Sequence, residues 1–197
     1  MPWPDPGTLR GAHARLEPLS PDHLAGLVEA VKDGELWKLW YTFVPKPEDM
    51  TREIDRRLGL REAGSMLPFT VFDAAGKIAG MSTYMNIDAA NRRVEIGSTW
   101  YARRVQRTPL NTQCKLLLLA HAFEAIDCIA VEFRTHFFNH QSRKALERLG
   151  SSPAGILRSH QVAPNGTLRH TLVFSIIASG WPTVTAHLTH QLTAKRR

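Results

Sequence analysis

The segment from Trp100 to Ile126 carries the residue types best suited to bind a charged ligand. It runs from a strand-like stretch through a basic turn, ARRVQRTPLN, into a long apolar helical pattern. The first N–H groups of a helix have no carbonyl partner inside the helix, and the helix dipole makes that end positive. This combination suits a phosphate group. Pro109 and Asn111 stand where glycine usually lets the backbone approach phosphate. The alternative is a solvated basic loop in which Asn111 caps the helix.

The cysteines and the strand histidines indicate no further chemistry. Cys114 and Cys128 lie in apolar patterns and form neither a CxxC pair nor a disulfide framework, so we expect reduced thiols and a cytoplasmic protein. His136, His160 and His170 lie on strand patterns without metal-ligand spacing, so no metal is implied.

Composition limits the class of protein. The 197 residues, 43% of them apolar, predict a single domain spanning 1–197, with its core at about 8–188 and a short basic C-terminal tail. The formal net charge of +7 favours an anionic ligand. No stretch approaches the roughly 20 apolar residues of a membrane span, so no membrane partner is expected. Nucleic-acid binding is an alternative that rests on charge alone, because no nucleic-acid-binding motif is present.

Alternation and turn residues predict the elements around the basic turn. Ser20 and Pro21 begin the first helix, and Asn165–Gly166 is a strong hairpin turn. Three consecutive antiparallel strands precede the basic turn, and a parallel crossover begins there, which predicts an α/β (α+β) mixed sheet with helices on its faces. Strands are expected at 9–19, 66–74, 77–88, 92–102, 130–138, 154–164 and 168–178, and helices at 20–34, 50–64, 111–126, 139–150 and 181–192.

The sequence resembles the GNAT-superfamily N-acetyltransferases, in the RimJ/RimL-type branch of ribosomal-protein N-terminal acetyltransferases. The resemblance runs from about Leu9 to Leu188, and three motifs carry it: the helix start NTQCK at 111–115, the N-x-x-S helix ending in Leu-Gly at 139–150, and the strand motif G-x-L-R at 155–158. It implies a GNAT-like acyl-CoA N-acyltransferase fold, with a mostly antiparallel central sheet, and acetyl transfer from acetyl-CoA to a primary amine on a peptide N-terminus or a small molecule.

The resemblance also implies where coenzyme A binds. In the family, the fourth strand offers main-chain groups to the pantetheine arm, and the following turn offers N–H groups to the pyrophosphate. The family pattern Q/R-x-x-G-x-G/A begins here at Gln106, while Pro109 lacks an N–H and removes one donor, for which the charge of Arg107 can compensate. The implied cofactor-binding residues are Ile96, Gly97, Ser98, Thr99, Trp100, Tyr101, Gln106, Arg107, Thr108, Leu110, Asn111, Thr112, Asn139, Ser142 and Arg143.

Glu95 is the candidate general base for direct transfer to the amine. It alternates with Val94 and Ile96 along its strand, and a half-buried carboxylate there would have a raised pKa. The alternative is an exposed strand carboxylate paired with Arg92 or Arg93.

Ser142 is the candidate hydrogen-bond donor to the leaving thiolate. Many relatives use a tyrosine seven positions after the helix-capping Asn139, where this sequence has Leu146, and the RimL-like branch implies the serine instead. Asn139 either holds the pantetheine or caps its helix, and Ser142 is alternatively a solvated hydroxyl.

An aromatic cluster lies between the first two helices, where the family recognises its acceptor. It contains Trp37, Trp40, Tyr41 and Phe43, and Trp40 and Tyr41 are the candidates for substrate contact, with Glu95; core packing is the alternative. Sheet edges and the apolar segment 172–181 make a homodimer plausible. A non-catalytic acyl-CoA-binding protein is the competing function, because the loop glycines and the tyrosine are replaced.

Overall fold

A single eight-stranded sheet organises the computed structural model, which describes residues 4, 7–163 and 165–194. Its strand order is β1-β2-β3-β4-β5-β6-β8-β7. The strands are β1 (Leu9–Arg10), β2 (Ala14–Pro18), β3 (Met66–Asp73), β4 (Ile78–Asp88), β5 (Arg93–Tyr101), β6 (Ala130–His136), β7 (Ser152–Val162) and β8 (Leu168–Ile177). The α-helices are α1 (Leu24–Lys32), α2 (Met50–Glu62), α3 (Leu110–Ala120), α4 (His140–Arg148) and α5 (Trp181–Thr193).

Strand pairing confirms the predicted mixed sheet. The neighbouring strands are antiparallel except for β5 and β6, which are parallel and joined through α3. The single strand predicted at 9–19 is wrong, because the chain turns back within it. Gly11 N donates to Ala14 O at 2.9 Å, so Leu9 pairs with Leu16 across a small hairpin.

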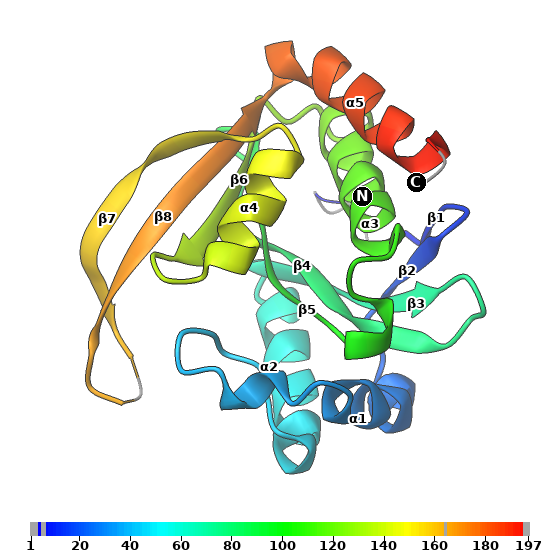
Figure 1. The fold of residues 1–197 in the computed structure, drawn as a ribbon, viewed down its shortest axis with the longest axis vertical. Coiled ribbons are helices and arrows are strands. Elements are labelled where there is room, and N and C mark those ends of the chain that lie inside the picture. Colours follow the sequence, from blue (N-terminus) through cyan, green and yellow to red (C-terminus); the bar gives the residue numbers. More distant parts are fainter. Residues whose placement is uncertain (1–3, 5–6, 164, 195–197) are drawn as a thin grey trace.

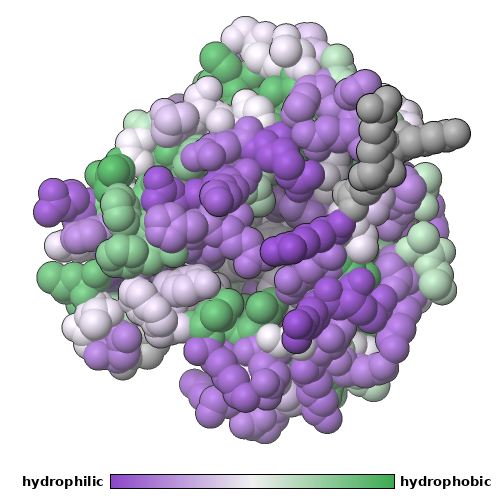
Figure 2. Space-filling view, viewed as in Figure 1, coloured by the Kyte–Doolittle hydropathy of each residue, from purple (hydrophilic) through white to green (hydrophobic). Residues whose placement is uncertain are grey.

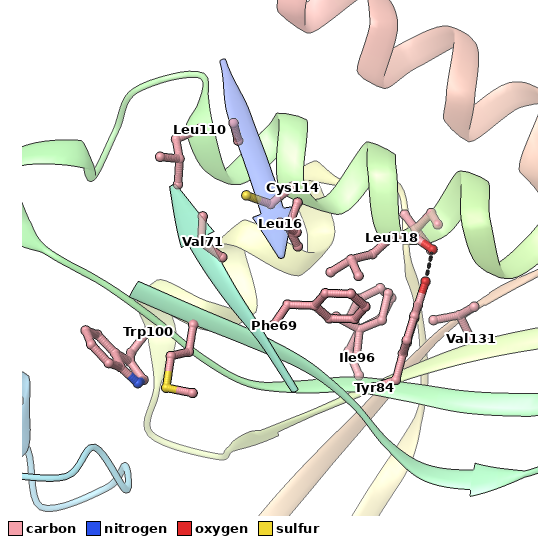
Figure 3. Packing of buried hydrophobic residues seen from close by; sticks show 14 of the residues in the cluster. Leu16, Phe69, Val71, Tyr84, Ile96, Trp100, Leu110, Cys114, Leu118 and Val131 are labelled. Atoms are coloured by element: carbon pink, nitrogen blue, oxygen red, sulfur yellow. Dashed lines mark hydrogen bonds between the residues drawn. The ribbon is translucent and has the colours of Figure 1, made fainter. Parts of the chain in front are cut away.

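Helices cover both faces of the sheet. α1 and α2 lie on one face, and α3 and α5 lie on the other (Figure 1). Between the sheet and α3 the buried core includes Leu16, Phe69, Ile96 and Leu118, and the Tyr84 hydroxyl donates to the Leu118 carbonyl (Figure 3). We call these two sides the α2 face and the α3 face.

The α3 helix supports the site through its continuation and its packing. It runs on into a π-helical segment, His121–Ala125, a type of irregularity that is often found at functional sites. Trp181 of α5 donates to Glu124 Oε1 at 2.8 Å and stacks on Phe123 at 5.4 Å, which fixes this segment. The predicted helix 111–126 therefore exists, in two geometries.

The β7–β8 hairpin projects from the rest of the molecule (Figure 1). Every residue of β7 is exposed, including Ile156, Leu157 and Val162. Figure 2 shows hydrophobic residues gathered on the left side, where this hairpin lies. β7 is also the sheet edge, so its outer main-chain groups face away from the sheet.

Candidate active site

The parallel strands β5 and β6 are paired only at their beginning. The register runs from Arg93 opposite Ala130 to Glu95 opposite Glu132. Beyond Glu95, β5 continues to Tyr101 and β6 to His136 without pairing to each other. The two strands therefore part beyond Glu95, and we call the stretch between the segments 96–101 and 133–136, which do not pair with each other, the β5–β6 slot. No parallel ladder uses the main-chain groups of this stretch, although Gly97 O and Tyr101 O accept hydrogen bonds from the side chains of Thr99 and Gln106.

A β-bulge at Ser98 interrupts the alternation of side chains between the two faces of the sheet along β5. Gly97 pairs with Thr83, but Trp100 pairs with Met81, so β5 has one extra residue in between. Ser98 takes up this residue with a left-handed φ of 47°.

The bulge places Glu95 and Thr99 on opposite faces. On the α2 face, Arg57 donates to Thr83 at 2.7 Å, opposite Gly97. On the α3 face, the Thr99 hydroxyl lies 2.8 Å from Ser82 Oγ and accepts from Lys115 of α3 at 3.2 Å. Glu95 shares the α2 face with Gly97, where a Cβ would lie 2.9 Å from Glu95 Oε1. Glycine at 97 thus leaves room for the carboxylate.

Glu95 is more buried than expected, with 4% of its surface exposed. Its Oε2 accepts from Asn86 Nδ2 at 2.7 Å and lies 3.3 Å from Arg134 Nε. Burial raises the pKa of Glu95, although the Asn86 hydrogen bond and the charges of Arg134 and Arg169 act to lower it. The carboxylate is therefore a candidate proton acceptor held by two side chains.

The predicted alternative, in which Glu95 pairs with Arg92 or Arg93, is wrong. Arg92 forms an ion pair with Asp127, and Arg93 forms one with Glu132. Both arginines are therefore engaged with other carboxylates, and the cation beside Glu95 comes from β6 instead.

A cavity of about 210 Å³ lies beside Glu95 on this part of the sheet. Glu132 accepts from Arg134 Nη2 at 3.2 Å, so the two carboxylates share one arginine. The cavity is lined by Asn86, Asp88, Arg93, Val94, Glu95, Glu132 and Arg134. It is polar and lies at the closed end of the β5–β6 slot.

The basic turn is held by its own side chains. The Gln106 amide donates to Tyr101 O at 3.0 Å, and the Thr108 hydroxyl donates to Val105 O at 2.6 Å and accepts from Leu110 N at 3.3 Å. Arg107 is exposed and has a left-handed φ of 59°. These contacts shape the turn between β5 and α3.

The start of α3 presents main chain rather than side chains. Pro109 occupies the N-cap position, so the predicted Asn111 cap is wrong and Asn111 lies in the first turn. Leu110 and Thr112 have buried side chains. Only their main chain is therefore suited to meet a ligand at this helix end, where first-turn N–H groups have no carbonyl partner within the helix.

The start of α4 lies directly after β6. Asn139 Oδ1 accepts from Ser142 N at 3.0 Å, so Asn139 caps the helix, which is one of its two predicted roles. The Ser142 side chain is partly exposed. Arg143 Nη1 donates to Phe137 O at 3.2 Å, and its guanidinium lies 5.4 Å from the centre of the Phe137 ring.

The aromatic loop reaches the end of β6. The Trp40 ring lies 5.1 Å from His136 and 5.9 Å from Phe138, while Tyr41 lies 6.3 Å from His136. Trp40 is 54% exposed, so it is a surface aromatic and not core. Burial, together with Arg169 and His170, lowers the pKa of His136.

The other two aromatic residues separate from this group. Trp37 packs against the hydrophobic core, and Phe43 is exposed. The structure thus brings only Trp40 and Tyr41 of the predicted cluster to the end of the β5–β6 slot.

Sequence reasoning missed several site residues, because their roles depend on contacts between distant elements. These residues are Asn86, Lys115, Arg134, Phe138 and Arg169. Lys115 alone carried a local signal, since a lysine in the apolar run NTQCKLLLLA falls on a buried stripe.

The described residues contain neither a membrane-spanning helix nor a cluster of metal ligands. No helix in this part of the chain is long and apolar enough to cross a bilayer. Over the same residues, no group of three or more His, Cys, Asp or Glu side chains is arranged to hold a metal ion. Cys114 and Cys128 are both buried free thiols, as expected.

Comparison with known proteins identifies the class to which this fold and site belong. Residues 13–152 match the family described as acetyltransferase (GNAT) domain. A curated relative, YdaF of Bacillus subtilis (strain 168), named a putative ribosomal N-acetyltransferase, is 26% identical over 84% of this chain and 90% of its own. The chain therefore belongs to the GNAT acetyltransferase family.

Solved structures agree with this assignment. A GCN5-related N-acetyltransferase from Brucella melitensis is 30% identical, with a TM-score of 0.86 over 98% of this chain and 88% of that chain. RimJ of Mycobacterium smegmatis, solved in complex with CoA-disulfide, has a TM-score of 0.78 over 96% of this chain and 95% of that chain. At 23% identity, RimJ supports the fold alone.

Proposed function

We propose that this acetyltransferase uses acetyl-CoA and transfers the acetyl group directly to a primary amine, on a peptide N-terminus or a small molecule. One observation carries the proposal: a buried carboxylate, Glu95, stands at the last β5–β6 pair, where the β5–β6 slot opens. A base beside an opening whose main-chain groups form no parallel ladder suits amine attack on a bound thioester.

The β5–β6 slot and the basic turn fit coenzyme A in chemistry. The main chain of 96–101, which is not paired with β6, would hold the pantetheine arm, and the turn 106–112 with the first turn of α3 would hold the pyrophosphate. Arg107 and Arg143 would supply positive charge, and Asn139 would shape the end of the slot. RimJ, which shares the fold, was solved in complex with CoA-disulfide, which supports coenzyme A as the ligand.

Glu95, on the α2 face, would act on the amine. Glu95 would accept the amine proton, through a water molecule if the amine lies several ångströms away. Its raised pKa makes it a stronger base than an exposed glutamate.

Ser142, in the first turn of α4, would donate a hydrogen bond to the departing thiolate. Cys114 is unsuited to a covalent route, because burial raises the pKa of its thiol to about 12.

Acceptor recognition would use the aromatic loop and the β7–β8 hairpin. Trp40 and Tyr41 lie over the end of β6, and Arg169 of β8 acts electrostatically on both Glu95 and His136. An acceptor would therefore pass between an aromatic wall and a cationic strand to reach Glu95.

We further infer that the protein is cytoplasmic, because its buried free thiols suit a reducing compartment.

We also infer that it forms a homodimer. An exposed apolar edge strand such as β7 is commonly covered by another chain. Light scattering after size-exclusion chromatography measures the assembly: twice the chain mass is expected, and a monomer would contradict the inference.

The experiment that tests the function is CoA release with two sets of acceptors. One set contains free and N-terminally blocked forms of the same peptides, and the other contains small primary amines. We expect release with at least one free amine and none with its blocked form. Release that does not depend on a free amine would contradict amine acetylation.

A further inference from the structure

Lys115 is a buried cation that the proposed chemistry has not yet used. It lies in α3 with 6% of its surface exposed. Its Nζ donates to Thr99 Oγ1 at 3.2 Å and lies 5.8 Å from the centre of the Phe133 ring. Thr99 belongs to β5 and Phe133 to β6, and both lie beyond the last pair of these strands. The ammonium therefore spans the β5–β6 slot on its α3 face.

No carboxylate among the described residues forms an ion pair with Lys115. The neighbouring groups are the Thr99 hydroxyl, the Phe133 ring and the Cys114 thiol. An ammonium has three N–H donors, and Thr99 accepts one of them. A buried charge without a counter-ion is costly, so the pKa of such a group shifts, and groups perturbed in this way cluster at functional sites.

Lys115 and Glu95 flank the β5–β6 slot from opposite faces. Lys115 lies five residues into α3, about 7 Å along the axis from the helix start that would hold the pyrophosphate. The pantetheine arm of coenzyme A, running from that helix start toward Glu95, would pass the Lys115 ammonium. The amides of such an arm are neutral, and the group in this stretch that becomes negative is the sulfur that leaves the acetyl group.

We propose that Lys115 stabilises and protonates the thiolate leaving group from the α3 face of the slot. This inference rests on the proposed use of acetyl-CoA. As the bond between the acetyl carbon and sulfur breaks, the electron pair goes to sulfur, and a proton moves from Lys115 Nζ to sulfur. The products are the CoA thiol and a neutral lysine, which regains a proton from solvent. The amine proton taken by Glu95 returns to solvent, so the reaction is balanced.

The acid strength of Lys115 fits this role. Burial lowers the pKa of Lys115 to about 8, close to the value of about 8.5 for an ordinary thiol. Proton transfer between groups of matched pKa is efficient. Ser142 can donate a hydrogen bond but is a poor acid, so the two residues would complement each other.

The test is the thiol pKa of bound CoA, measured by the ultraviolet absorbance of the thiolate. The complex with desulfo-CoA serves as the blank. Burial raises the pKa of both Cys114 and Cys128 to about 12, so these thiols stay silent over the range of interest. With the wild-type protein, the bound thiol should titrate about 1 unit below free CoA, the low end of the effect of a contacting opposite charge, which leaves its pKa close to that of Lys115.

Two variants separate the proposal from simpler explanations. Lys115→Met keeps the length and removes the charge, and should return the bound thiol to the value of free CoA. Lys77→Met removes an exposed lysine of the β3–β4 turn and should leave the lowered value unchanged.

An unchanged thiol pKa in Lys115→Met, with CoA still bound, would overturn the role of Lys115. Failure of the wild-type protein to bind CoA would instead overturn the proposed function. If Lys115→Met does not fold, Thr99→Val removes the hydrogen-bond partner of Lys115 and should move the thiol pKa of bound CoA from the wild-type value toward that of free CoA, and an unchanged value would overturn the role of Lys115.

Discussion

Glu95 and Thr99 lie four residues apart on β5 but face opposite sides of the sheet. On a regular strand they would share a face, because side chains alternate with a period of two. The extra residue at Ser98 reverses the alternation between them. One strand thus presents a carboxylate to the α2 face and, through Thr99, contacts the Lys115 ammonium on the α3 face. This arrangement lets acid and base chemistry meet at one opening without neutralising each other.

Replacing Glu95 tests the base. Glu95→Gln keeps the shape and can still bond to Asn86, but it cannot accept the amine proton. We expect kcat/KM for the amine to fall about 10²–10⁴-fold, the usual contribution of a general base. The affinity for acetyl-CoA should stay within a factor of about two, because Glu95 faces away from the α3 face. Glu62→Gln, on the exposed end of α2, is the control. Unchanged turnover in Glu95→Gln would refute the assignment.

The pH dependence of activity should report the raised pKa of Glu95. The base acts when it is deprotonated, so kcat/KM should fall as the pH drops through a value above that of an ordinary glutamate. Arg134 lowers the pKa of Glu95, so Arg134→Met should raise it and move this acid limb to higher pH. Arg92→Met removes a surface arginine paired with Asp127 and should leave the limb in place. A limb that moves equally in both variants would reflect net charge and not the Arg134 contact.

Much of the fold follows from local pattern, and the failures have local causes. The Asn165–Gly166 turn, the capping residues and the period of the apolar positions predicted most strands and all five α-helices. The strand 9–19 failed because its alternation continues through Gly11 while the chain reverses there. The bulge at Ser98 was missed although Gly97 precedes it, because a glycine inside a strand pattern is also compatible with other features and Ser98 is not a residue type that favours positive φ.

The outline of the candidate site follows from the order of elements, because its main-chain parts lie at the junctions between them. Glu95 and the turn 106–112 needed only the family pattern. The partners of Glu95 did not follow, because Asn86 and Arg134 come from neighbouring strands whose register no local signal sets. Their identification required the paired sheet.

Pro109 should limit the affinity for acetyl-CoA. It occupies the N-cap position of α3 and has no N–H to offer a phosphate. Pro109→Ala adds one donor, and a hydrogen bond to a charged group contributes about 1.5–3 kcal/mol. We expect binding at least about tenfold tighter by calorimetric titration. Pro47→Ala, at the start of a short 3-10 helix, should have no such effect. Equal affinity in Pro109→Ala and wild type would mean that the phosphates do not approach this turn.

Asn139 should contribute to stability as a helix cap. Its Oδ1 accepts from Ser142 N, so Asn139→Ala should lower the free energy of unfolding by about 1 kcal/mol, measured by urea denaturation. Asn139→Asp keeps the acceptor and should retain most of that stability. Equal losses in both variants would show that the cap is not the source of the stability.

Calorimetric titration of the wild-type protein with acetyl-CoA, at low and high salt, tests the central claim most directly. The account predicts one site per chain with micromolar affinity that weakens at high salt, because the turn 106–112 and nearby arginines would hold the phosphates. Absence of binding at both salt concentrations would contradict it, since neither Glu95 nor Lys115 would then have a thioester on which to act.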